Sequence, residues 1–160
     1  AEAWARNLVA NFARRPQGND RAQVKAIFEG QCDIAILNHY YFGKLLNSDD
    51  AAHREWADSI NLVFPNQGED DRGAHVNISG GGIAIHSKNK ANAQRLLEFL
   101  VSEKAQSLYA KINYEYPVNE SLELPEDLKL WGTFKEDQTS VSEIARLSVT
   151  AQKIIDRVGW

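Results

Sequence analysis

Two adjacent tyrosines, Tyr40 and Tyr41, follow an apolar run and are the residues of this sequence best suited to bind one ligand together. In a β-strand neighbouring side chains point to opposite faces, whereas at a helix start they diverge by about 100°. Asn38 precedes the pair in a position typical of a helix N-cap, so we expect a helix to begin here. Both phenols could then lean towards one point, where helix N–H groups would also favour an anion.

Phenol oxygens bind metal ions well only after they lose their protons, and free tyrosine has a pKa near 10. A hard, highly charged cation can displace those protons, and ferric iron is the usual metal of phenolate sites. The bare pair also allows a plainer interpretation, in which one tyrosine packs in the core and the other lies on the surface.

Other candidates for chemistry are weaker. The glycine run at 80–82 lacks the lysine of a phosphate-binding loop, and it favours a close crossing of two backbones instead. No G-x-S-x-G motif marks a nucleophile. The histidines are far apart, without metal-ligand spacing, and we expect surface or turn positions for them: His39, His53, His75 and His86.

The composition is that of a folded domain. The chain has 160 residues, of which 43% are apolar, and a formal charge of −4. Without a cluster of basic residues, nucleic acid is not an expected partner. Cys32 is the only cysteine, so no disulfide framework is expected. The sequence contains no Met and opens on Ala1, from which we expect that a preceding segment was removed.

Apolar spacing predicts helices alternating with strands, and therefore an α/β fold. Only about four strands are visible, and the chain opens on a helix with nothing before it to pack on, which suggests part of a larger protein. Strands are expected at 32–37, at 60–64 and in two pieces around the glycines of 74–86. Helices are expected at 1–15, from Asp20 to about 29, from about 40, and at 51–58, 91–101, 102–109 and 141–158.

Several segments, taken in order, carry a resemblance to a known family. They are "NLVANFARRPQGNDRAQVKAIFEGQCDIAILNHYYFGKLL", "FPNQ", "GAHVNISGGG", "EYPV" and "DRVGW". Together they resemble the ferric-iron-binding proteins of bacterial ABC importers. The match runs through nearly all of the chain but covers only the C-terminal half of that family.

The resemblance implies a type II periplasmic-binding-protein architecture, in which two lobes close on the metal. Residues 1–70 and 121–160 would belong to the tyrosine-bearing lobe, and 71–120 to the other lobe. Tyr40 and Tyr41 would ligate Fe3+, and Asn38 would help to hold a synergistic anion such as carbonate or phosphate. The family's remaining ligands come from an N-terminal half that this sequence does not contain.

The predicted function is therefore ferric iron binding and delivery to the membrane permease of an ABC importer, in the periplasm or another extracytoplasmic space, and not catalysis. The expected partner is the N-terminal half of the same protein, as a nicked chain, or else a second copy. Three alternatives remain open from the residues: a binding protein for another small solute or anion, a small α/β hydrolase, and a structural fragment without activity of its own.

Overall fold

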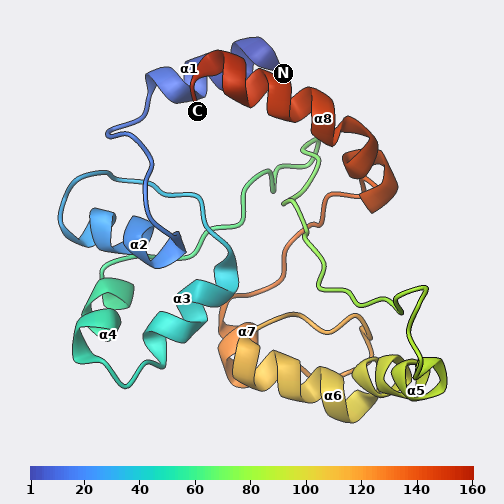
Figure 1. Cartoon of the computed structure of the whole chain (residues 1–160). Helices are drawn as coiled ribbons and strands as arrows, with labels where there is room; N and C mark the ends of the chain where they lie inside the picture. Colours follow the sequence, from blue (N-terminus) through green and yellow to red (C-terminus); the bar gives the residue numbers. More distant parts are fainter.

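A computed structural model describes all residues from 1 to 160, and its regular structure is entirely helical (Figure 1). Eight α-helices and one π-helix follow one another along the chain. They are α1 Glu2–Ala10, α2 Asp20–Phe28, α3 His39–Leu46, α4 Ala51–Asp58, α5 Lys90–Leu100, α6 Glu103–Leu108, the π-helix η1 Tyr109–Asn113, α7 Glu126–Leu130 and α8 Val141–Val158. The helices predicted from apolar spacing are thus confirmed, although α1 is shorter than expected.

Side chains at the helix starts explain several of these boundaries. In four helices the N-cap side chain accepts a hydrogen bond from an N–H group of the first turn. These residues are Asn19, Asp50, Ser102 and Ser140. From the sequence, Asp20 is also a plausible N-cap of its helix, but in the structure the N-cap is Asn19 and Asp20 is the first residue of α2. Gly159 ends α8 with φ of 74°, the left-handed conformation for which glycine is suited.

No β-strand forms, and the prediction of an α/β fold is not confirmed in this chain. The one β-type pairing is an isolated parallel bridge between Ala74 and Glu136. A strand exists only where a neighbouring strand takes up its N–H and C=O groups, and the predicted strands find no such neighbour. Their apolar side chains lie in solvent, with exposed fractions of 84% for Ile34, 78% for Val63 and 77% for Ile85.

The buried core is small and lies where α2, α3 and α4 meet. Only 14 of the 160 residues are buried, so most apolar side chains keep some contact with solvent. One cluster consists of Val24, Phe42, Leu45 and Ala57. A second cluster joins η1 to α7 through Ala110, Tyr114 and Leu128. The indole of Trp131 packs against both clusters and so connects the two groups of helices.

The first and last helices lie side by side (Figure 1). The ring of Trp160 lies 6.3 Å from the ring of Trp4 and 5.9 Å from that of Phe12. Arg157 pairs with the carboxylate of Glu2. Trp4 nevertheless remains 62% exposed, so this helix pair leaves an apolar face open to solvent.

Two distant segments, 66–74 and 134–139, cross and are joined by hydrogen bonds. The backbone N–H of Ala74 donates to the carbonyl of Lys135 at 2.8 Å, and the N–H of Lys135 donates to Oε1 of Gln67 at 2.6 Å. Gly73 lies in the tightest place, with φ of 94°, and a Cβ there would lie 2.5 Å from the carbonyl carbon of Glu136. The crossing therefore depends on glycine at this position.

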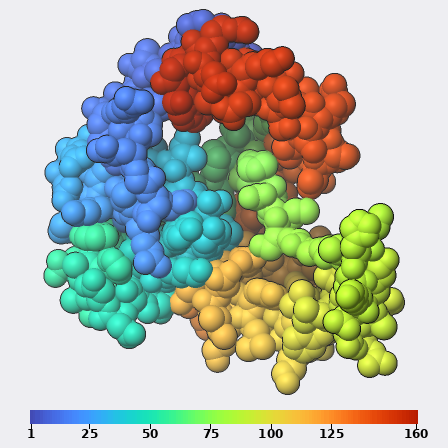
Figure 2. Space-filling model, in the orientation of Figure 1, coloured from blue at the N-terminus to red at the C-terminus, as the bar shows by residue number.

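The outer surface is hollowed on one side. Figure 2 shows a hollow beneath α8, bordered by the cyan and green parts of the chain. The division into two lobes, 1–70 with 121–160 and 71–120, remains a prediction.

Candidate functional site

Tyr40 and Tyr41 lie in the first turn of α3, separated from its N-cap residue Asn38 by His39. Their ring centroids are 4.5 Å apart and the ring planes are inclined by 35°, so the two side chains run together. Both are partly buried. The backbone turn that begins the helix makes this possible, because a continuing strand would have sent the two rings to opposite faces.

The electrostatic surroundings keep Tyr40 protonated. The adjacent Tyr41 hydroxyl, together with partial burial and the negative charges of Asp20 and Glu115, raises the pKa of Tyr40 to about 12. The ammonium group of Lys44 lies 5.1 Å from the centre of the Tyr40 ring. At neutral pH Tyr40 is therefore a phenol, and only a strongly attracting cation could convert it to phenolate.

His39 fixes the start of α3 from one side. Its Nε2 lies 2.8 Å from the carbonyl oxygen of Tyr114, which can only accept, so Nε2 carries the proton. Burial lowers the pKa of His39, so the ring is neutral. The expectation of a surface or turn position for His39 is wrong, since it is the first residue of α3 and partly buried. Apolar spacing could not reveal this contact, because Tyr114 is far away in the sequence.

Asn38 begins the helix as expected, but its side chain does not cap it. Its backbone N–H donates to Oδ1 of Asp20 at 2.8 Å, and its side-chain Nδ2 donates to the same oxygen at 3.3 Å. The second hydrogen of Nδ2 and the side-chain carbonyl stay free for a ligand. The sequence reasoning treated Asp20 only as a helix start, and an asparagine eighteen residues later gives no local signal of this pairing.

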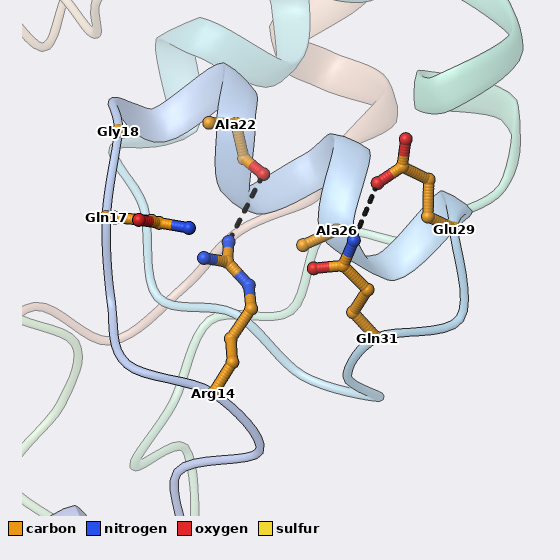
Figure 3. Close-up of a pocket in the computed structure, with 7 residues that line it drawn as sticks. All are labelled: Arg14, Gln17, Gly18, Ala22, Ala26, Glu29 and Gln31. Carbon is orange, nitrogen blue, oxygen red and sulfur yellow. Dashed lines mark hydrogen bonds between the residues drawn. The ribbon is translucent and has the colours of Figure 1, made fainter.

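A separate pocket of about 340 Å³ lies beside α2 and does not include the tyrosines (Figure 3). The side chains of Arg14, Glu29 and Gln31 already bond to neighbours. Arg14 donates to Oε1 of Gln23 at 3.0 Å, and Gln31 donates to Oε2 of Glu29 at 2.8 Å. This pocket is open and its charged groups are satisfied, so it offers no converging set of ligand groups.

Two further features of the structure concern clusters of ionisable side chains and long apolar helices. No three of the His, Cys, Asp and Glu side chains come together in a way that could hold a metal ion. None of the helices combines the length and the apolar character needed to cross a membrane. The closely paired phenol rings of Tyr40 and Tyr41 are the candidate metal centre of this chain.

Known proteins resemble the chain along nearly its whole length. Iron uptake protein A1 of Synechocystis is 44% identical, over 99% of this chain and 43% of the relative. The Fe(3+)-binding periplasmic protein of Serratia marcescens is 33% identical, over 72% of this chain and 32% of the relative. A Trichodesmium protein solved in complex with iron and citrate superposes with a TM-score of 0.92 at 45% identity, over 99% of this chain and 50% of the other. No protein-family model matches the chain.

This chain has the sequence and the fold of one half of a ferric-binding protein. It spans about half the length of the relatives that it matches. The sequence resemblance to the ferric-binding family is thus confirmed. The names of these relatives describe iron binding and uptake, not catalysis, which agrees with the expectation of a non-enzyme at the level of the family.

Proposed function

We propose that this ferric-binding half holds Fe3+ through the phenolate oxygens of Tyr40 and Tyr41. The observation that carries the proposal is the close pairing of the two phenol rings, 4.5 Å apart, at the start of α3. Two adjacent phenolates repel each other unless a cation lies between or beside them. A trivalent, oxygen-preferring ion compensates that repulsion best, and the relatives named for iron make ferric iron the cation of choice.

Two phenolates do not complete the coordination of ferric iron. The remaining ligands come from a polypeptide segment corresponding to the half of the relatives that this chain does not match. A small anion contributes as well, of the class of carbonate, phosphate or the citrate of the Trichodesmium complex. Asn38 is the candidate anion contact on this chain, because one hydrogen of its Nδ2 and its side-chain carbonyl are free.

The assembled protein carries iron to the permease of an ABC importer and works outside the cytoplasm. Support for the location comes from the Serratia relative, which is named as periplasmic. Support for a covering segment comes from the apolar side chains of the predicted strands, which this chain leaves in solvent. That segment is the other half of the protein, in the same chain or as a nicked second chain.

Ferric iron added to the intact protein, meaning this half together with the half that completes it, tests the proposal. Phenolate-to-iron charge transfer should produce a visible absorption band, which capture of a colourless solute or anion would not. Tyr40→Phe and Tyr41→Phe should each weaken or abolish the band while leaving the unfolding midpoint nearly unchanged, since only one oxygen atom is lost. Tyr109→Phe is the matched control, because Tyr109 lies in η1, away from the pair. A band that survives both substitutions would overturn the proposal.

A further inference from the structure

The carboxylate of Asp20 joins the first residue of α2 to the N-cap residue of α3. Its Oδ1 accepts two hydrogen bonds from Asn38, at 2.8 Å from the backbone N–H and at 3.3 Å from Nδ2. A bond from a neutral donor to an ionised acceptor is stronger than one between two neutral groups. The double contact therefore restrains Asn38 in both its backbone and its side chain.

The way α3 begins differs from the four helices of the chain whose N-cap side chains cap them. The N-cap side chains of α2, α4, α6 and α8 each bond to their own helix, whereas the side chain of Asn38 bonds to Asp20 instead. The cap of α3 is thus used to attach the helix to its neighbour. Asn38 therefore makes no capping bond to its own helix, and its side chain instead attaches the start of α3 to α2.

The restraint at Asn38 passes directly to the tyrosines. The backbone N–H of Tyr41 donates to the carbonyl of Asn38 at 3.1 Å, so Asn38 closes the turn that contains both phenols. On the other side of the same turn, His39 bonds to the carbonyl of Tyr114. The first turn of α3 is therefore held from two sides, by α2 through Asp20 and by the residue after η1 through His39.

We infer that Asp20 is a positioning residue of the iron site. Its carboxylate holds Asn38, and through it the first turn of α3, in the orientation that brings both phenol oxygens to one metal ion. It acts through Asn38 and is not itself a ligand. This inference rests on the proposed function, because it assigns Asp20 a role in iron binding by the tyrosine pair.

Two substitutions in the intact iron-loaded protein distinguish the effect of the hydrogen bonds of Asp20 from the effect of its charge. Asp20→Asn keeps an oxygen that can accept from Asn38, whereas Asp20→Ala removes the acceptor as well as the charge. Asp20→Ala should shift the charge-transfer band and lower iron affinity by about 10- to 100-fold, as loss of a residue that orients a metal ligand commonly does. It should also speed hydrogen exchange at the amide of Asn38. Asp20→Asn should keep the wild-type band and the wild-type rate of hydrogen exchange at the Asn38 amide. Its loss of iron affinity should be smaller than that of Asp20→Ala.

Asp50→Ala is the matched control, because Asp50 is also a carboxylate at a helix start but bonds only to its own helix and to nearby residues. It should lower the unfolding midpoint and leave the band unchanged. A wild-type band and affinity in Asp20→Ala would overturn the positioning role, as would an Asp20→Asn band altered as much as that of Asp20→Ala. Absence of any band in the wild-type protein would instead show that the proposed function is wrong.

Discussion

Two neighbouring phenols form a site that responds to the charge of its ligand. Ionising one ring makes ionisation of the other less favourable, because two negative oxygens then lie close together. Tyr40, whose pKa is raised to about 12, therefore remains a neutral phenol near pH 7. In the proposed iron site, a trivalent ion compensates the cost of removing the proton of Tyr40 better than an ion of low charge does. The proposal therefore implies a preference of the pair for ferric iron.

Iron retention should fall as the pH falls. Binding of Fe3+ displaces the proton of Tyr40, so protons compete with the metal throughout the range below the pKa of Tyr40. The apparent affinity should rise about tenfold per pH unit for each proton displaced. Competition with a chelator, corrected for the chelator's own protonation, measures this slope between pH 5 and 8. Tyr40→Phe should reduce the slope by about one proton, and an affinity independent of pH would contradict phenolate ligation.

Local sequence order was enough to predict where the helix that carries the tyrosine pair begins, but not the distant contacts that hold its first turn. Tyr40, Tyr41 and the N-cap position of Asn38 follow from local order, because a helix start is determined by residues within one turn. The contacts of Asp20 with Asn38 and of His39 with Tyr114 join separate segments. Neither pairing has a spacing signal, so only the folded arrangement reveals it.

The same difference between local and distant contacts applies to helices and strands. Helices close their hydrogen bonds within the segment, so apolar spacing and caps were enough to locate α2, α4 and α8. A strand closes its bonds with another segment, and the apolar run at 32–37 has a strand-like composition without a neighbour to pair with. The expected α/β architecture depends on strand pairings, and none beyond the isolated bridge of Ala74 and Glu136 forms in this structure.

Gly73→Ala should destabilise the crossing of segments 66–74 and 134–139. The left-handed φ of 94° disfavours any side chain, and the new Cβ would lie 2.5 Å from the backbone of Glu136. Backbone strain of this kind costs about 1–3 kcal/mol, and the steric overlap adds to that cost. Urea unfolding of the intact protein measures the loss. Gly82→Ala is the control, because no atom lies within 4 Å of its added Cβ. Equal stability of both variants would show that the backbone at the crossing moves enough to accommodate the new methyl group.

At the scale of the whole molecule, this chain leaves a large apolar surface exposed to solvent. Ile34, Ile36, Val63 and Ile85 are each more than three-quarters exposed. Burial of one such side chain contributes about 1.5–3 kcal/mol, so covering all four would contribute as much as the net stability of a typical domain, about 5–15 kcal/mol. The relatives, about twice as long as this chain, have the additional residues that could cover this surface.

Ile36→Ser tests whether a further polypeptide segment covers this surface in the intact protein. Leu37 packs against the cluster formed by α2, α3 and α4, whereas Ile36 is 76% exposed in this chain. If a sheet from the other half covers Ile36, the substitution should lower the free energy of unfolding of the intact protein by about 1.5–3 kcal/mol. Leu130→Ser is the control, because Leu130 is 82% exposed at the end of α7 and belongs to no predicted strand. It should change stability by less than about 0.5 kcal/mol. An equally small effect at both positions would show that Ile36 stays in water and that no segment covers this surface.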